Sequence, residues 1–296
     1  MKKNKYKLKL NETFPLRSGW LQKGINIISG KEDAFKKAIA PKEFGLGTNM
    51  CSALKYYLKS SNIIADGKQG MVQLTEDFGK VIFREDRFCE LLFTIFLIHI
   101  QLVSNKRNCI VYNVFFNNKF NNFTKDYLVE YIKEFLLSED EDFKESSLIS
   151  DVQVMLRSYV KIGDENPEEN MFSSPLSLLG LLKFENGTYK KTMPSSDFLD
   201  FRVVYYSITN AYKEEFINNK PIKFNLDDII QKPNNPMSMF NLSVQSLITY
   251  LEEMEKNGFI DFVKTAGLNT VIIKKRLSLQ ELYEDYKQGK GIKLNV

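Results

Sequence analysis

Apolar and polar positions alternate along most of the chain with the period of α-helices, and short strand-like runs interrupt them. The same order of elements occurs three times: a leading helix, a short second helix, a third helix and then a β-hairpin. The sequence therefore predicts a mainly α fold with small β-hairpins, an α+β class, built from tandem winged helix-turn-helix units.

The first repeat has the order helix, helix, turn, helix, hairpin, helix. An opening helix is expected from Leu16, and a second helix over 31–40 ends before Pro41, which punctuates the chain. Thr48 is the expected N-cap of a third helix that runs to Ser61. A hairpin around an Asp66-Gly67 turn and a further helix beginning near Thr75 complete the unit.

The second and third repeats follow the same order with other sequences. In the second, Thr124 caps a helix, another helix covers 146–156, and Asn186-Gly187 between apolar runs is the strongest hairpin signal in the chain. The elements expected in the third are helices over 197–216, 226–230 and 243–257, a hairpin across Ala266-Gly267, and a last helix from Ser278.

These elements divide the chain into four parts. They are a basic winged helix over 1–83, a helical connector over 84–122, a second winged-helix-like unit over 123–195, and a third, acidic unit with a C-terminal helix over 196–296. A length of 296 residues suits two or three domains of ordinary size.

Charge is distributed unevenly between these parts. Residues 1–82 carry 15 Lys and Arg against 7 Asp and Glu, whereas the remaining residues carry 26 against 30. A polyanion would therefore dock at the N-terminal end. A basic surface that is merely solvated explains the same imbalance, so charge alone does not decide between the two.

In winged helices the third helix enters the major groove and the wing contacts the DNA backbone. Asn pairs well with an adenine edge, and Lys binds phosphate or guanine. Asn49 has a competing interpretation, in which it helps Thr48 to cap the helix. The candidate DNA-binding residues are Thr48, Asn49, Ser52, Lys55 and Lys59 on the third helix, Lys68 and Gln69 in the wing, and Lys3, Lys5 and Lys7 in the basic tail.

The other two units are less suited to DNA. The third helix of the second unit carries Lys144 and Arg157 but is flanked by acidic runs, and that of the third unit contains Glu252, Glu253 and Glu255. Because carboxylates repel phosphate, the third unit is expected to be structural or to bind protein partners, and it offers a surface for oligomerisation.

The residues that catalysis usually needs are sparse. We find no Gly-rich phosphate loop and no Gly-x-Ser-x-Gly motif. His99 is the one histidine and lies in an apolar helix, which favours a hydrogen-bonded core residue, and Cys51, Cys89 and Cys109 lack metal-ligand spacing. The acidic run 139–142 could bind Mg²⁺ in a nuclease but is typical of a solvated loop. We expect no enzyme, no cofactor and no metal.

Localisation follows from the cysteines and the apolar runs. Three cysteines without a disulfide framework suit a reducing compartment. The basic N-terminus has no apolar run behind it, and the longest apolar stretch, 88–103, is too short and polar to span a bilayer. A cytoplasmic protein with no membrane partner is expected.

Several sequence blocks, in order along the chain, resemble an uncharacterised bacterial domain-of-unknown-function family. The blocks are Leu16-Arg-Ser-Gly-Trp-Leu-Gln-Lys-Gly24, Phe44-Gly-Leu-Gly-Thr-Asn-Met50, Leu54-Lys-Tyr-Tyr57, Leu74-Thr-Glu-Asp-Phe-Gly79, Asp151-Val with Leu156-Arg-Ser-Tyr-Val160, Ser174-Pro-Leu-Ser-Leu-Leu-Gly-Leu181 and Thr265-Ala-Gly-Leu268. Members of that family often carry tryptophans near 91–112, whereas this chain has only Trp20.

The resemblance implies a genomic setting rather than a set of catalytic residues. Genes of that family lie in defence islands beside phosphoadenosine-phosphosulfate-reductase-like and cysteine desulfurase genes of DNA phosphorothioation systems. The leading hypothesis is therefore an accessory protein that binds double-stranded DNA together with the proteins of a modification or phage-defence complex. The alternatives are a protein-protein scaffold and a transcriptional regulator of the defence operon.

Overall fold

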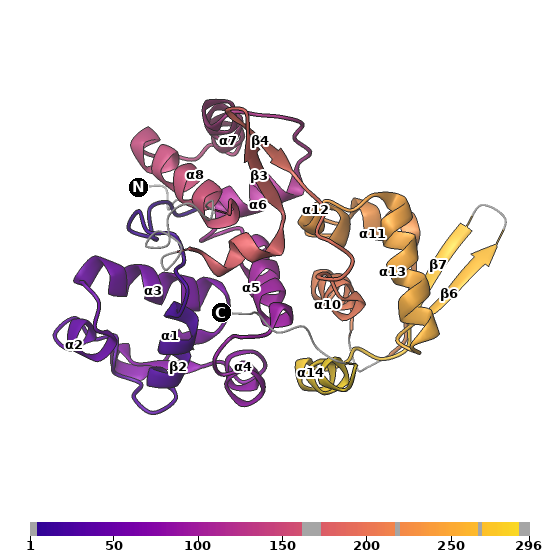
Figure 1. The fold of residues 1–296 in the computed structure, drawn as a ribbon, viewed down its shortest axis with the longest axis horizontal. Helices are drawn as coiled ribbons and strands as arrows, with labels where there is room; N and C mark the ends of the chain where they lie inside the picture. Colours follow the sequence, from indigo (N-terminus) through magenta and orange to yellow (C-terminus); the bar gives the residue numbers. More distant parts are fainter. Residues whose placement is uncertain (1–4, 162–172, 217–219, 266–267, 290–296) are drawn as a thin grey trace.

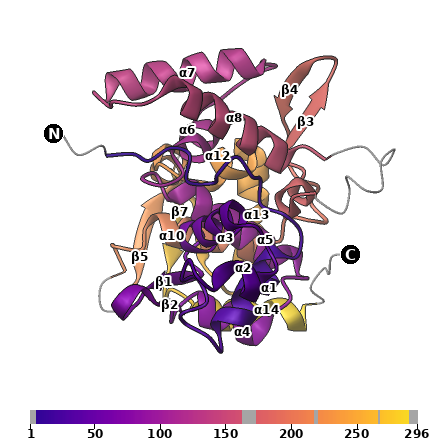
Figure 2. The same ribbon diagram turned by 90° about the vertical axis from the view of Figure 1, so that its left-hand side faces the viewer.

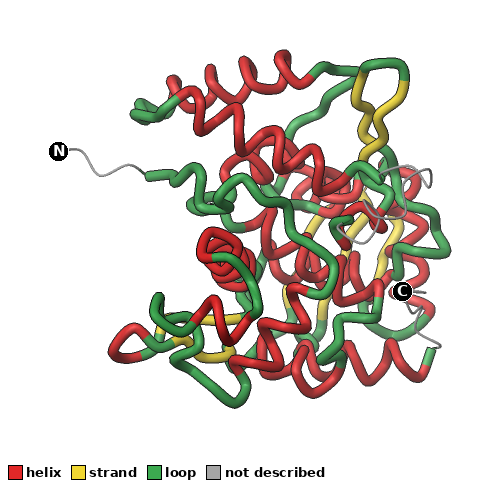
Figure 3. Tube along the Cα trace, turned by 60° about the vertical axis from the view of Figure 1, so that its left-hand side comes forward, coloured by secondary structure: helices red, strands yellow, loops and turns green. Residues whose placement is uncertain are grey.

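The computed structural model describes residues 5–161, 173–216, 220–265 and 268–289. Helices make up most of this part of the chain, and its strands form two two-stranded sheets and one three-stranded sheet, all antiparallel (Figure 3). The predicted α+β class with small β-hairpins is confirmed. The predicted repetition of winged-helix units is not confirmed.

The N-terminal part contains the following elements. They are α1 (Trp20–Ile28), α2 (Ala40–Phe44), α3 (Thr48–Ser60), β1 (Ile64–Asp66), the 3-10 helix η1 (Lys68–Gly70), β2 (Val72–Leu74), α4 (Gly79–Glu85), α5 (Leu92–Ser104) and α6 (Ile110–Asn117).

The later elements follow in chain order. They are α7 (Lys125–Ser138), α8 (Glu145–Tyr159), the 3-10 helix η2 (Pro175–Leu179), β3 (Leu182–Glu185), β4 (Thr188–Lys191), α10 (Phe201–Ala211), β5 (Ile222–Asn225), α11 (Leu226–Gln231), α12 (Pro236–Phe240), α13 (Val244–Lys256), β6 (Asp261–Thr265), β7 (Leu268–Ile273) and α14 (Leu279–Gln288).

Helix α5 lies at the centre of the molecule (Figure 1). Its sequence is apolar on every side, which is the pattern of a fully buried helix, and 11 of its 13 residues are buried. It packs against α6, η2 and α10. The segment predicted as a connector thus supplies core contacts to parts on both sides of it, and the four-part division of the chain stays a prediction.

His99 joins α5 to two other helices. Its Nδ1 accepts a hydrogen bond of 2.7 Å from the Tyr159 hydroxyl, and its Nε2 donates one of 3.1 Å to the carbonyl oxygen of Met239. Burial lowers the pKa of His99 to about 3, so the ring is neutral. The interpretation of His99 as a hydrogen-bonded core residue is confirmed.

The first repeat has the predicted order of elements but different bounds. The helix expected over 31–40 is a series of turns, and α2 begins only at Ala40. The reason is Pro41, which occupies the first turn of α2, where its missing N–H and fixed φ favour a helix start rather than an end. Phe35 still packs inward and stacks on Phe44 with ring centroids 4.4 Å apart.

The second repeat confirms the strongest local signals. Thr124 caps α7 by accepting a hydrogen bond from the amide of Tyr127. Asn186 and Gly187 have φ of 52° and 77°, as a two-residue turn between β3 and β4 requires. The described residues before this hairpin include two long helices, α7 and α8, and the 3-10 helix η2.

The third repeat adds a strand that the sequence pattern did not predict. β5 pairs with β7, which also pairs with β6, in the order β5-β7-β6. α10 is shorter than the predicted 197–216 because Asp200 caps it and turns follow Ala211. Ser243 caps α13 as predicted, and the helix predicted from Ser278 is α14, which Ser278 caps. The turn predicted at 266–267 lies outside the described residues.

Residues 5–18 form a strap between α8 and α3 (Figure 2). The amide of Lys9 and the side-chain amide of Asn11 both donate to the Asp151 carboxylate, at 2.8 and 3.0 Å. Burial raises the pKa of Asp151 to about 6, and these two donors oppose that rise. The strap thus fastens α8 to the N-terminal part. In the described part of the chain, no helix is long and apolar enough to cross a membrane.

Candidate nucleic-acid interface

The outer face of α3 carries five of the residues selected from the sequence. They are Thr48, Asn49, Ser52, Lys55 and Lys59, all exposed or half-buried. Spacings of three and four residues bring them to one side of the helix. The opposite side is closely packed, since a Cβ at Gly24 of α1 would collide with Leu58 of α3. α3 is therefore fixed with its polar face outward.

The first turn of α3 differs from the prediction. Gly47, not Thr48, is the N-cap residue, and Thr48 is the first residue of the helix. Gly47 has extended backbone (φ −63°, ψ 158°) and no side chain that could accept a hydrogen bond from the helix. Within the described residues, no side chain caps this end, so Asn49 does not act as a cap here. Its amide is exposed.

Lys55 is the cation on this face that stands without an acidic partner among the described residues. Its side chain is half-buried, with Nζ 5.7 Å from the centre of the Phe35 ring. Burial lowers the pKa of Lys55 and the charge of Lys59 lowers it further, while the charge of Asp66, which does not form an ion pair with Lys55, opposes this fall. A cation held in place by an aromatic face and not neutralised is well prepared to bind phosphate.

Lys59 is neutralised within the protein. Its Nζ lies 2.6 Å from Oδ2 of Asp66 at the end of β1. The hydrogen bond from Lys59 lowers the pKa of Asp66. The sequence assigned Lys59 a phosphate contact equal to that of Lys55, and the structure gives it an internal partner instead, because β1 folds back beside the end of α3.

Lys37 joins this face although the sequence analysis did not select it. With Thr48, Ser52 and Lys55 it lines a small hollow of about 70 Å³ between the turns before α2 and the start of α3. Lys37 is exposed. It was missed because 31–40 was interpreted as a helix with Phe35 and Ile39 inward, a geometry that gives no reason to bring Lys37 to α3.

The wing is longer than predicted. Asp66 pairs with Val72, so the connection spans 67–71 rather than turning at Asp66-Gly67, and it contains η1. Lys68 and Gln69 are both exposed at its tip, and Gln69 has a positive φ of 54°. The structure thus places both selected wing residues on an exposed loop that follows α3.

The described part of the basic tail, from Lys5 onward, is held against the body of the protein. Lys3 lies outside the described residues. Lys5 donates from Nζ to Glu139 at 2.5 Å, and its backbone amide donates to Glu141. The hydrogen bond with Glu139 raises the pKa of Lys5 above its usual range. Lys7 is exposed, and its amide bonds to the carbonyl oxygen of Arg107 at 2.9 Å.

Ion pairs within the protein neutralise several of the N-terminal lysines. Besides Lys5 and Lys59, Lys31 pairs with Glu43 at 2.6 Å and Lys80 with Glu76 at 2.5 Å. The excess of basic residues in 1–82 is therefore a poor measure of the field that a ligand meets. On the α3 side, Lys37, Lys55 and Lys68 have no ion pair among the described residues.

Other groups that could carry chemistry are buried or serve internal contacts. Cys51, Cys89 and Cys109 are buried free thiols. Burial raises the pKa of all three, which keeps them protonated. The run 139–142 supplies Glu139 and Glu141 to the strap. In the described ranges, no group of three or more His, Cys, Asp or Glu side chains could hold a metal ion.

Two solved structures share this fold. A magnesium ion-bound SspB crystal structure matches with a TM-score of 0.80 and 21% identity, and an SspB crystal structure with 0.78 and 22%. Each match covers 95% of this chain and 87% of the other. No curated protein matches the chain. The family described as "Protein of unknown function (DUF4007)" matches residues 10–286, and the chain belongs to it.

Proposed function

We propose that this protein is a DNA-binding accessory protein of a bacterial DNA-modification system of the phosphorothioation type, or of a related phage-defence system, in the cytoplasm. Residues 20–85 act as a winged helix: α3 enters the major groove of double-stranded DNA and the 67–71 loop contacts the backbone. Lys37 and Lys55 bind phosphates, and Asn49 reads a base edge.

One observation carries this proposal. The outer face of α3 is polar and exposed, and Lys55 on it has no acidic partner among the described residues. The order of three helices, hairpin and helix over 20–85 supports it. The shared fold of SspB and the resemblance to a family found beside phosphorothioation genes support the cellular setting.

A scaffold role is the second candidate, and α13 favours it. Glu252, Glu253 and Glu255 are exposed on this helix, and the apolar side chains of Val244 and Val263 are exposed nearby in the chain. An acidic surface with apolar residues suits a basic protein partner or a second copy of this chain better than DNA. The two roles are compatible, since they use different parts of the molecule.

We further propose that the protein acts by binding rather than by catalysis. One of the two similar SspB structures contains magnesium. The described acidic residues of this chain do not gather into a group that would hold such an ion, so we derive no step through a metal. Incubating the protein with supercoiled plasmid and Mg²⁺ tests this point: appearance of nicked circles, abolished by EDTA, would overturn it.

Duplex binding by the full chain tests the main proposal. In fluorescence anisotropy at two salt concentrations, Lys55→Ala should weaken binding about threefold to tenfold and reduce the salt slope by about one. The matched control is Lys256→Ala on α13, which makes the same change of net charge far from the interface and should leave both quantities near wild type. Equal effects of the two variants would remove α3 from the interface.

A further inference from the structure

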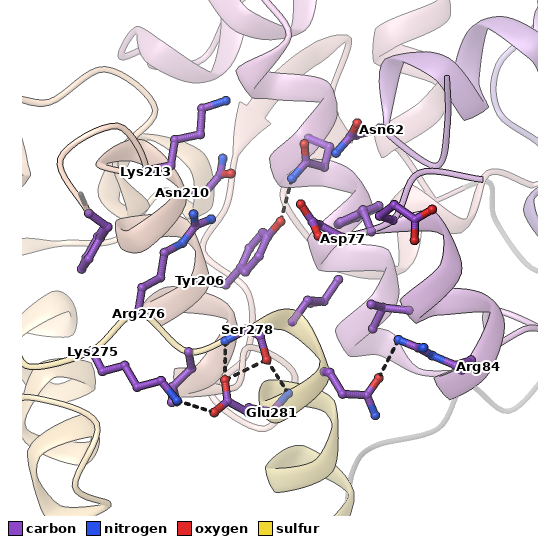
Figure 4. A pocket seen from close by; sticks show the side chains of 18 residues that line it. Asn62, Asp77, Arg84, Tyr206, Asn210, Lys213, Lys275, Arg276, Ser278 and Glu281 are labelled. Carbon is purple, nitrogen blue, oxygen red and sulfur yellow. Dashed lines mark hydrogen bonds and ion pairs between the residues drawn. The ribbon is translucent and has the colours of Figure 1, made fainter. Parts of the chain in front are cut away.

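A second polar cleft lies away from α3, between the N-terminal and C-terminal parts of the chain (Figure 4). Its volume is about 710 Å³, which is in the range of small-molecule sites. Its walls come from α4, α5, α10, α14 and the segment that joins β7 to α14. Segments far apart in the sequence thus build one concave site.

Among the described residues, the cations that line this cleft are Arg84, Lys213, Lys275 and Arg276, and they differ in how far acidic side chains neutralise them. Lys275 pairs with Glu281 at 2.8 Å. Among the described residues, Arg84 donates a hydrogen bond to the amide oxygen of Gln280, at 3.4 Å, and forms no ion pair. Lys213 approaches Glu214 at 3.8 Å, the outer limit of an ion pair, with both side chains largely exposed.

Arg276 is the most available of these cations. It is half-buried and, within the part of the chain that the structure describes, has neither a hydrogen bond nor an ion pair. Its side chain lies on the same wall as those of Asn210 and Lys213 (Figure 4). Two cations and an amide on one wall match the charge and the oxygen atoms of a phosphate group.

The opposite wall offers a different set of groups. Asn62 and Asp77 lie there, both exposed to the cleft (Figure 4). An amide and a carboxylate accept hydrogen bonds from base amino groups or sugar hydroxyls, which an inorganic anion lacks. Phe78 and Phe216 also line the cleft and give it apolar surface. One wall thus complements the phosphate of a nucleotide, and the other complements its base or sugar.

We propose that this cleft binds a nucleotide, with the phosphate held by Arg276 and Lys213 and the base or sugar facing Asn62 and Asp77. The ligand is a free nucleotide or the terminal nucleotide of a DNA strand, which share this chemistry. The site is independent of the proposed DNA interface on α3. Arg276 and Lys213 are not part of that interface, and Lys37 and Lys55 do not line the cleft.

Calorimetric titration of the full chain with each of the four deoxynucleoside 5′-monophosphates, without added metal, tests the proposal. We expect binding at millimolar concentration or below by at least one of them. Arg276→Gln should weaken it about tenfold or more, because hydrogen bonds to charged groups are lost. Arg157→Gln, an exposed residue of α8 outside the cleft, is the matched control and should bind as wild type does.

Further arms make each outcome decisive. Lys213→Gln, on an exposed side chain, should weaken binding without lowering the melting temperature, which covers the case in which Arg276→Gln folds poorly. Inorganic phosphate binding as tightly as every nucleotide, or unchanged affinity in both cleft variants, would overturn the proposal. Competition by a 5′-phosphorylated oligonucleotide but not by its 5′-hydroxyl form would identify a DNA end as the source. Lys55→Ala should leave nucleotide binding intact, so failure of one site does not imply failure of the other.

Discussion

Helices α3 and α13 occupy corresponding places in the first and third of the repeats that the sequence predicts. Each has 13 residues, and each is followed by an antiparallel hairpin. Their outer surfaces have opposite character. α3 presents hydroxyl and amide groups and Lys55, which has no ion pair among the described residues, whereas α13 presents Glu252, Glu253 and Glu255.

A helix followed by a hairpin therefore does not by itself identify a ligand. The acidic residues of α13 also contact the neighbouring strand β6. Glu252 pairs with Lys264 of β6, and Glu255 accepts a hydrogen bond from the amide of Phe262 at 3.0 Å. These acids therefore hold the hairpin against the helix, a task for which α3 uses Lys59 and Asp66. Side chains, rather than the order of elements, decide which of the two helices could approach phosphate.

Reversing the charge of the α3 face should have the largest effect. In the variant Lys37→Glu with Lys55→Glu, the outer side of α3 becomes acidic like that of α13, and duplex affinity should fall about a hundredfold at moderate salt. Anisotropy measures this loss. The control places the same two Lys→Glu changes on the exposed Lys256 and Lys274, and a comparable loss there would mean that only net charge matters.

Replacing Asn49 should give a smaller and more selective effect. Because its amide is exposed and does not cap α3, Asn49→Ala should cost about 1–3 kcal/mol on a preferred duplex and almost nothing on random DNA. The preferred duplex is first selected from a random library. A lower melting temperature with unchanged relative affinities would instead assign Asn49 to the stability of the helix.

A third prediction tests whether both helices belong to one cooperative body. The pKa of His99 is about 3 in the folded chain and about 6.5 in the unfolded chain. The unfolded state therefore binds more protons, and the stability that His99 contributes is present above pH 6.5 and lost as pH falls below it. Relative to His99→Gln, wild type should lose stability as pH falls below 6.5, with a slope that approaches about 1.4 kcal/mol per pH unit near pH 5.

The measurement follows unfolding with two probes. Fluorescence of Trp20 reports the N-terminal part, and far-UV circular dichroism reports all helices. Asp151, whose pKa is raised to about 6, titrates with the opposite sign, but it is present in both proteins and cancels in the difference. We expect the two probes to give the same midpoint. Separate midpoints would show that α3 and α13 sit on independently folding parts.

Local signals in the sequence predicted much of the fold. Thr124, Ser243 and Ser278 cap helices because the hydroxyl and the amides it satisfies lie within three residues. Asn186-Gly187 forms its turn for the same local reason. The start of α2 was wrong because Pro41 suits either a stop or a first turn, and only the packing of Phe35 on Phe44 decides between them.

The candidate sites were harder to predict because they depend on distant partners. The exposed face of α3 follows from helical periodicity alone. Whether Lys5 is free depends on Glu139, which is 134 residues away. The cleft that Arg276 lines has walls from α4 and α10, and no pattern of residue spacing predicts that these two helices lie side by side.

The strap has a consequence for how the protein meets competing polyanions. Lys5 is bound to carboxylates of the same molecule, and an intramolecular partner acts at an effective concentration in the millimolar range. A phosphate group that binds the ammonium of Lys5 has to compete with Glu139, and success would leave that carboxylate facing the incoming strand. The strap therefore acts as an intramolecular competitor for Lys5. It reduces the binding of weakly held polyanions more than the binding of tightly held ones.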